Sequence, residues 1–301
     1  MAVIKEDSMK KGIPGKVFSF GYWRNLFSHR KPFHYVFLRI MRIAGLGPFI
    51  KFDAGGYRLY LFPTSISADL WLLPGSRPYD MLPCIRPGNI VVDVGANIGT
   101  TVISAALRTG TGGKVYAFEA HPEIFGYLNR NTSLNGLANV STFNVAVGDG
   151  EAPVSFSDYE EDECNRIVDD REGIPTKAGK LDDLLRDIGK IDLLKIDVEG
   201  YELFVLKGAM ETLKRTGCVN VEISEQHFVK YGYHAKDVFD FIWKSGFKCF
   251  RLFDDRRCEE VSKDTCNLSG YYNIIAVRDI HYIDSLVHVS KQEGPEMEKS
   301  T

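Results

Sequence analysis

Short apolar runs alternate with longer amphipathic stretches from about residue 89 onwards. Runs of this kind, rich in Val and Ile, are typical of strands that are buried on both faces of a parallel sheet. The predicted strands are residues 90–94, 115–118, 141–147, 192–197 and 218–223. The predicted crossover helices include residues 102–107, 123–134 and 181–188.

This alternation predicts an α/β fold with a mostly parallel, seven-stranded, Rossmann-like sheet and helices on both faces. Two further apolar runs, at 247–250 and 273–277, are expected to complete the sheet with an antiparallel edge. Ligands of such sheets bind beyond the carboxyl ends of the strands. The candidate site residues are therefore those that end each predicted strand.

The pattern changes outside this central region. Residues 1–64 are predicted to form an accessory segment, with a leader, a short amphipathic helix within 33–43, and a β-hairpin at 50–62 around a Gly-Gly turn. Residues 65–284 are predicted to form the catalytic domain, beginning with helical turns up to about residue 82. The polar tail, 285–301, is expected to be disordered.

Charge is distributed unevenly along the chain. The net charge of −3 gives no reason to expect a nucleic-acid partner, yet the first 52 residues carry ten Lys and Arg against two acids. Two interpretations of residues 30–48 remain open: contact with an anionic membrane surface, or a helix that packs on the catalytic domain and exposes its arginines. The second is favoured, and the segment is too short and too charged to span a bilayer.

The six cysteines are scattered without Cys-x-x-Cys spacing, which argues against a zinc site. The first apolar run comes late and follows many charges, unlike a secretory signal. Together these features predict a reduced, cytoplasmic protein.

The clearest chemical signal lies between the first predicted strand and its helix. The run Val-Val-Asp93-Val-Gly95-Ala-Asn-Ile-Gly99 ends a strand in an acid and then turns through two glycines. Glycine lets the backbone turn sharply and lets a ligand approach it closely. The helix that follows offers unpaired N–H groups at its start. This arrangement predicts a nucleotide-type cofactor site.

The spacing of these residues discriminates between cofactors. A dinucleotide site has Gly-x-Gly-x-x-Gly, whereas this turn has Gly95 and Gly99 separated by three residues. Asp93 would repel a pyrophosphate but can accept a hydrogen bond from an ammonium group. Glu119 ends the next predicted strand, where a carboxylate suits the two hydroxyls of a ribose. S-adenosylmethionine fits this pair of acids better than a dinucleotide.

Four motifs together carry a resemblance to a known family. They are Asp93-Val-Gly-Ala-Asn-Ile-Gly, Phe118-Glu119-Ala-His-Pro, Asn144-Val-Ala-Val-Gly-Asp149 and Leu194-Lys-Ile-Asp197-Val-Glu199-Gly-Tyr-Glu202. Over about residues 65–280 the chain resembles FkbM-like methyltransferases. The resemblance implies a class I S-adenosylmethionine fold and methylation of a hydroxyl on a sugar, glycolipid or natural product.

The predicted cofactor contacts follow the strand ends. Asp93 is expected to face the amino-acid end of S-adenosylmethionine, and Glu119 to accept hydrogen bonds from the ribose. Backbone amides at 144–146 are expected to recognise the adenine. The predicted cofactor-binding residues are Asp93, Gly95, Ala96, Asn97, Gly99, Glu119, Asn144 and Ala146.

Candidate catalytic groups follow the fourth and fifth predicted strands: Asp197, Glu199, Glu222 and His227. In one interpretation a single carboxylate or the imidazole is the general base for an acceptor hydroxyl. In another, Asp197 and Glu222 hold Mg²⁺, which polarises that hydroxyl. The metal-free version is favoured because a third ligand is not evident. A purely structural alternative makes Asp197 a helix N-cap and Glu199 a first-turn acid.

The predicted function is S-adenosylmethionine-dependent O-methyl transfer to a sugar, glycolipid or other small molecule. An N-methyltransferase and a non-catalytic cofactor-binding protein of the same fold are the alternatives. The Asn/Asp-Pro-Pro-Tyr motif that positions the amine of a flipped base is absent after the fourth strand, which argues against methylation of nucleic-acid bases.

Overall fold

The structure is a computed structural model of the 301-residue chain. It describes residues 44, 46, 49, 51–53, 56–60, 62, 84–158, 165–168, 173–252, 258–266 and 270–280. The predicted amphipathic helix at 33–43, the predicted helical turns at 65–82 and the predicted tail at 285–301 lie outside the described residues.

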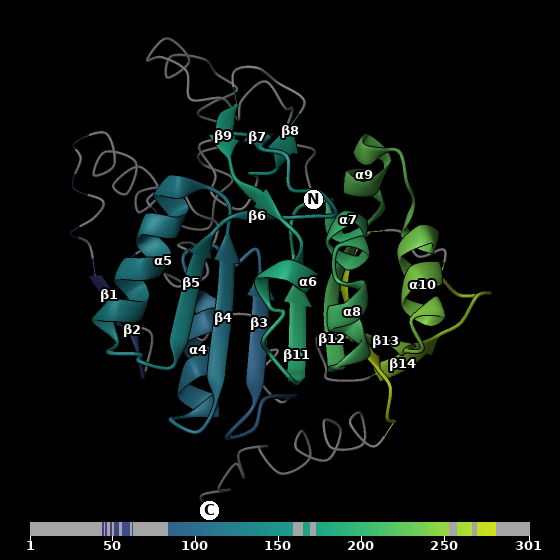
Figure 1. The fold of residues 1–301 in the computed structure, drawn as a ribbon, viewed down its shortest axis with the longest axis horizontal. Coiled ribbons are helices and arrows are strands. Elements are labelled where there is room, and N and C mark those ends of the chain that lie inside the picture. Colours follow the sequence, from purple (N-terminus) through teal and green to yellow (C-terminus); the bar gives the residue numbers. More distant parts are fainter. Residues whose placement is uncertain are drawn as a thin grey trace, which may run out of the picture.

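An eight-stranded sheet forms the centre of the molecule, in the order β14-β13-β15-β12-β11-β3-β4-β5 (Figure 1). The parallel strands are β3 (Ile90–Val94), β4 (Lys114–Glu119), β5 (Val140–Asn144), β11 (Ile191–Ile196) and β12 (Thr216–Ser224). β15 (Tyr271–Val277) pairs antiparallel with both β12 and β13 (Lys248–Leu252), so β13 runs in the same direction as the parallel strands. β15 and the edge strand β14 (Cys258–Val261) run in the opposite direction. The predicted parallel sheet with an antiparallel edge is confirmed, and β14 adds an eighth strand to it.

The predicted strand at 141–147 is two strands. β5 ends at Asn144, and β6 (Ala146–Val147) pairs in parallel with β10 (Ala178–Gly179), away from the main sheet. The residues of β5 are half-buried or exposed, whereas both residues of β6 are buried. The sequence pattern does not show where the chain leaves the main sheet.

Helices cover both faces of the sheet, as predicted. They are α4 (Thr100–Thr109), α5 (Pro122–Leu134), α6 (Leu181–Leu184), α7 (Glu202–Lys207), α8 (Met210–Lys214), α9 (Glu225–Phe228) and α10 (Ala235–Lys244), with the 3-10 turn η6 (Val229–Tyr231) after α9. α6 ends four residues before the predicted boundary, because the Arg215 guanidinium donates to the Leu185 carbonyl (2.8 Å) and the chain then turns into β11.

Strand alternation sorts the core into two layers. Val92 and Val94 of β3 face a cluster that includes residues of α7, α8 and α10, whereas Val91 faces α4. Asp93 shares the Val91 side of the strand, since side chains alternate along a strand. Asp93 is thus buried on the α4 side of the sheet, near the carboxyl end of β3.

The predicted β-hairpin is confirmed: β1 (Lys51–Asp53) pairs antiparallel with β2 (Arg58–Tyr60). Two asparagines on consecutive turns of α5 bind the backbone of β2 as a neighbouring strand would. Asn131 bonds the N–H and the carbonyl of Tyr60 (2.6 and 3.1 Å), and Asn135 bonds those of Arg58 (2.8 and 2.6 Å). The hairpin is therefore fastened to the catalytic fold along α5.

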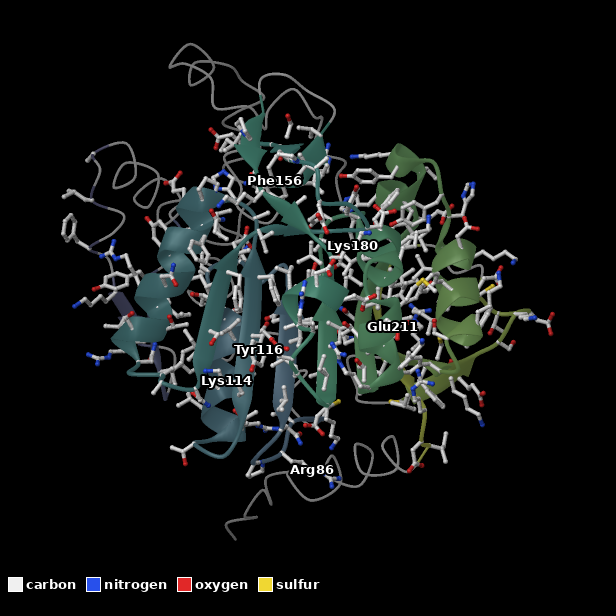
Figure 2. All side chains as sticks on the ribbon, viewed as in Figure 1. Arg86, Lys114, Tyr116, Phe156, Lys180 and Glu211 are labelled. Carbon is white, nitrogen blue, oxygen red and sulfur yellow. The ribbon has the colours of Figure 1, made fainter. Side chains whose placement is uncertain are left out.

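A small three-stranded sheet lies beyond the carboxyl ends of the central strands (Figure 1). It consists of β7 (Val154–Phe156), β8 (Ile167–Val168) and β9 (Ile174–Thr176). Figure 2 shows Phe156 and Lys180 on this side of the molecule, with Arg86 and Lys114 at the opposite end.

This small sheet is tied down on two sides. His121 lies 3.1 Å from Asp158, and the Tyr231 hydroxyl donates to the Ile167 carbonyl (2.7 Å). It therefore covers the edge at which ligands of parallel sheets bind. Within the described residues, no helix has the length and apolar character needed to cross a membrane.

Candidate functional site

The Gly turn after β3 folds back against the neighbouring strands. The amides of Gly95 and Ala96 both donate to the Phe118 carbonyl (3.0 and 2.9 Å), so the turn rests on the end of β4. Gly95 has a φ of +82°, and a Cβ there would lie 1.8 Å from the Asp197 carbonyl oxygen. Only glycine can occupy this position, and the turn thereby reaches the end of β11. Gly99, with a φ of +97°, is the N-cap of α4.

Glu119 ends β4 beside this turn. Its side chain is 6% exposed, and its two carboxylate oxygens accept backbone hydrogen bonds from Asn97 (2.8 Å) and His121 (2.9 Å). Burial raises the pKa of Glu119 to about 7, although these backbone bonds oppose the shift. Each oxygen keeps a second lone pair, so the carboxylate can still accept from a ligand hydroxyl.

Asp93 is paired with a residue that the sequence analysis did not select. Lys195 is its cross-strand partner on β11, and the Lys195 Nζ lies 3.3 Å from Asp93 and 3.1 Å from Asp197. Burial raises the pKa of Asp93, whose side chain is 1% exposed, and Lys195 opposes that rise. Burial alone would lower the pKa of Lys195, but Asp197 and Asp93 raise it, so the ammonium group stays charged. The signal available in the sequence was a lysine inside an otherwise apolar strand.

The predicted adenine segment is largely occupied by protein contacts. The Asn144 side chain donates to the carbonyls of Glu119 and Ala120, each at 2.9 Å. The Ala146 amide donates to the Lys177 carbonyl (2.8 Å). The Ala146 N–H is therefore not free to recognise a base.

The turn after β11 is held in an unusual backbone conformation. Glu199 has a φ of +56°, which is uncommon for a residue other than glycine. Buried Glu202 accepts from the amides of Val198 (3.0 Å) and Gly200 (3.3 Å) and so braces the turn. Burial raises the pKa of Glu202 to about 8.

The N-cap of α7 is Tyr201 and its first-turn acid is Glu202. The purely structural interpretation of Asp197 as an N-cap and Glu199 as a first-turn acid is therefore wrong.

Three predicted catalytic residues come together beside this turn. Glu199, Glu222 and His227 each bring one nitrogen or oxygen atom to within 4.8 Å of the others. His227 Nδ1 lies 3.0 Å from Glu199 Oε2, and His227 Nε2 makes a short hydrogen bond with the Tyr271 hydroxyl. Burial and then the charge of Asp197 raise the pKa of Glu222 to about 10.

Asp197, the fourth predicted catalytic residue, is not one of these three clustered groups, although its charge acts on Glu222. Its carboxylate is 36% exposed and points to Lys195. Tyr271, like Lys195, was missed from the sequence because nothing local marks a tyrosine on the antiparallel strand as a site residue.

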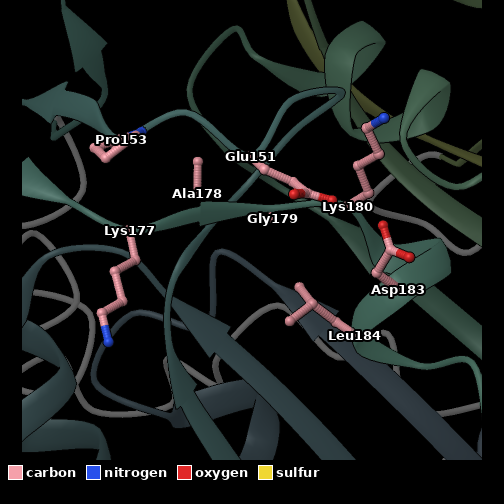
Figure 3. A pocket seen from close by; sticks show the side chains of 8 residues that line it. All are labelled: Glu151, Pro153, Lys177, Ala178, Gly179, Lys180, Asp183 and Leu184. Carbon is pink, nitrogen blue, oxygen red and sulfur yellow. The ribbon is translucent and has the colours of Figure 1, made fainter.

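A cavity of about 360 Å³ lies next to the small sheet (Figure 3). Its lining residues are Glu151, Pro153, Lys177, Ala178, Gly179, Lys180, Asp183 and Leu184. Among the described residues that line it, none belongs to the predicted site. The predicted site residues lie instead at the ends of β3, β4, β11 and β12, and the candidate site is placed there.

A mostly parallel sheet with β15 inserted antiparallel between β12 and β13, and a Gly turn between two acid-terminated strands, defines a class I methyltransferase fold. Residues 93–249 match the family described as the methyltransferase FkbM domain. The chain belongs to this family of S-adenosylmethionine-dependent methyltransferases, as the sequence motifs predicted.

The chain is also similar to individual proteins. It is 30% identical over 139 residues to the hexuronic acid methyltransferase AglP of Haloferax volcanii, covering 45% of this chain and 56% of that protein. It is 32% identical over 158 residues to the 31-O-demethyl-FK506 methyltransferase FkbM of Streptomyces tacrolimicus, covering 41% and 60%. The match thus spans somewhat more than half of each relative.

Among solved structures, the chain is similar to a methyltransferase FkbM from Methylobacillus flagellatus KT. The TM-score is 0.41 at 13% identity, over 85% of this chain and 57% of that one. The fold assignment therefore rests on the strand order and on the family match, not on this structural similarity.

Proposed function

We propose that the protein is an S-adenosylmethionine-dependent O-methyltransferase that acts on a hydroxyl of a sugar, glycolipid or other small molecule. The observation that carries this proposal is the position of two buried acids, Asp93 and Glu119, on either side of the Gly95–Gly99 turn. The open cluster of Glu199, Glu222 and His227 lies at the neighbouring strand ends. In this proposal, one edge of the sheet holds the cofactor beside groups suited to an acceptor.

In this proposal the cofactor lies along the turn after β3. Glu119 accepts hydrogen bonds from both ribose hydroxyls, and Asp93 accepts from the ammonium group of the methionine end. Gly95, Ala96, Asn97 and Gly99 bring the backbone close to the cofactor. Asn144 and Ala146 line its adenine end. Lys195 supplies a counter-charge to Asp93 and opposes the rise in its pKa, because a buried carboxylate needs a partner to remain charged.

Methyl transfer from S-adenosylmethionine is an in-line displacement, so catalysis consists mainly of holding the two reactants close and aligned. The acceptor oxygen bonds to the methyl carbon as the bond from carbon to sulfur breaks, and S-adenosylhomocysteine leaves. The hydroxyl proton has to leave during this step. We assign its removal to the cluster of Glu199, Glu222 and His227, while Asp197, bound to Lys195, has a positioning role.

The named relatives support a hydroxyl acceptor. The name of one contains hexuronic acid, a sugar acid, and that of the other describes a demethylated oxygen. We therefore propose the acceptor as a chemical class, a hydroxyl-bearing sugar, glycolipid or other small molecule.

The proposal is tested by incubating the full chain with methyl-deuterated S-adenosylmethionine and a panel of uronic acids, neutral sugars, amino sugars, glycolipids and polyol natural products. Mass spectrometry of the products identifies the methylated atom. Label on a hydroxyl oxygen, absent with Glu119→Ala, supports O-methyl transfer. Label on the amine of an amino sugar supports the N-methyltransferase alternative instead. Tight cofactor binding with no labelled product from any acceptor supports a binding protein.

A further inference from the structure

We propose that Glu199, Glu222 and His227 bind a divalent cation of the Mn²⁺ or Zn²⁺ type on the acceptor side of the site. That the cation lies beside the acceptor rests on the proposed function, whereas the binding of the cation itself does not. The three side chains come from the turn after β11, from β12 and from α9, and they supply two carboxylates and one imidazole. Oxygen and nitrogen ligands in this combination are typical of such cations.

The distances between the ligand atoms fit a coordination shell. Glu199 Oε2 and His227 Nδ1 are 3.0 Å apart, and each of the three residues offers an atom within 4.8 Å of the others. Neighbouring ligands that each lie about 2.1 Å from an octahedral cation are roughly 3 Å apart. Glu199 and His227 already have this spacing, and the Glu222 carboxylate is near enough to join them after a small side-chain movement.

The orientation of His227 supports the same conclusion. Among the residues that the structure describes, its Nδ1 has no hydrogen-bond partner despite lying 3.0 Å from a carboxylate oxygen. Its Nε2 contacts the Tyr271 hydroxyl. In the tautomer that donates Nε2–H to Tyr271, Nδ1 turns a lone pair towards Glu199, and two acceptors this close need a positive charge between them. A metal-binding histidine is commonly oriented in this way by a bond from its other nitrogen.

The local charge also favours a cation. Asp197 and Glu202 lie within electrostatic range of Glu222, in addition to Glu199, and Lys195 is the cation that opposes them. Lys195 is already shared between Asp93 and Asp197. Carboxylates gathered in a half-buried site are costly unless a counter-charge neutralises them.

The structure changes which ligands a metal would have. From the sequence, Mg²⁺ on Asp197 and Glu222 was an alternative without an evident third ligand. The Asp197 carboxylate lies 3.1 Å from Lys195, whereas Glu199 and His227 complete a set of three with Glu222. An imidazole ligand favours Zn²⁺ or Mn²⁺ over Mg²⁺. Glu199 is 23% exposed and His227 14%, so both side chains are accessible from solvent, from which an acceptor could approach.

The test is titration of the chelator-treated full chain with MnCl₂ and with ZnCl₂ in the absence of cofactor and acceptor, by calorimetry and by electron paramagnetic resonance of bound Mn²⁺. We expect one cation per chain. Glu222→Gln and His227→Ala should each weaken its binding at least tenfold, while Tyr271→Phe should weaken it about tenfold through the lost orienting bond.

His234→Ala is the matched control, because His234 forms a similar pair with Glu225 (2.6 Å) but on an exposed surface. It should leave cation binding unchanged. Retained binding of S-adenosylhomocysteine shows that each variant is folded. The proposal is overturned if the wild-type chain binds neither cation, or if Glu222→Gln and His227→Ala both bind as the wild type does.

These results separate the cation site from the proposed function. Tight binding that depends on Glu222 and His227 supports the site even if no acceptor is methylated. Undiminished methyl transfer by a metal-free enzyme, together with no cation binding, overturns the site while the proposed function stands.

Discussion

The side-chain amide of Asn131 donates a hydrogen bond of 2.7 Å to the carbonyl oxygen of Ile98, which joins helix α5 to the cofactor turn. The same amide group bonds Tyr60 of the hairpin, and the Asn131 side chain is fully buried. One asparagine therefore connects the N-terminal hairpin, α5 and the segment that precedes Gly99. The hairpin is a structural support of the proposed cofactor site.

Asn131→Ala should destabilise the protein by about 2 to 3 kcal/mol, because it leaves buried groups of Tyr60 and Ile98 without partners. Urea unfolding measures this change. Asn135→Ala removes a similar but more exposed set of bonds to Arg58 and should cost about 1 kcal/mol. Equal losses in the two variants would contradict a special role for Asn131.

Lys195→Met should destabilise the fold by about 3 to 5 kcal/mol, since it leaves the buried Asp93 carboxylate without its counter-charge. It should also weaken binding of S-adenosylhomocysteine. The control is Lys190→Met: Lys190 pairs with Asp192 at 2.5 Å but is 74% exposed, and such pairs contribute about 0 to 1 kcal/mol. Thermal unfolding of both variants measures these losses of stability. A loss in Lys195→Met as small as that in Lys190→Met would show that Asp93 is not held as an ion.

Cofactor affinity should depend on pH through Glu119. Burial raises its pKa to about 7, so the side chain gains a proton as the pH falls below that value and loses capacity to accept from a ribose hydroxyl. Calorimetric titration with S-adenosylhomocysteine should show weaker binding at about pH 6 than at about pH 8. Glu119→Gln should bind more weakly and remove most of that difference. A pH dependence that survives in Glu119→Gln would assign it to another group.

The same shift has an opposite consequence for the unliganded fold. The pKa of Glu119 rises from its ordinary value of 4.5 to about 7 on folding. The folded chain therefore binds the Glu119 proton more tightly than the unfolded chain does. The stability that this proton confers is present at low pH and is lost as the pH rises from about 4.5 to about 7. In Glu119→Gln, this part of the pH dependence of unfolding should disappear.

Gly95→Ala should abolish cofactor binding. Its Cβ would lie 1.8 Å from the Asp197 carbonyl oxygen, so the turn or the end of β11 would have to move. Gly136→Ala is the control, because Gly136 also has a positive φ (+65°) but open space around it. That variant should lose about 1 to 2 kcal/mol of stability from backbone strain alone and retain the cofactor. Normal binding by Gly95→Ala would contradict the close approach.

The positions of Asp93 and Glu119 at neighbouring strand ends could be predicted from the sequence, because parallel strands bring their carboxyl ends together. Their contacts with the cofactor remain part of the proposal. Lys195 was not predicted, since a lysine within an apolar strand gains meaning only from its register with Asp93. Asn131 was missed for a related reason: Tyr60, its partner on the hairpin, is 71 residues away in the chain.

The acceptor side was harder to predict, because it depends on three-dimensional arrangement. Glu199, Glu222 and His227 could be named as candidates, yet only the structure shows that they converge while Asp197 turns to Lys195. Tyr271 comes from the antiparallel strand β15, whose place beside β12 follows from the complete sheet. Local patterns could not assign the role of each acid.

The most direct test of the central claim is calorimetric titration of the full chain with S-adenosylhomocysteine, alongside Glu119→Ala. The site at the ends of β3 and β4 predicts one bound molecule per chain with micromolar affinity, and a clear loss of affinity in the variant. No binding by the wild-type chain, or equal binding by both, would contradict the placement of the cofactor and the methyltransferase function that rests on it.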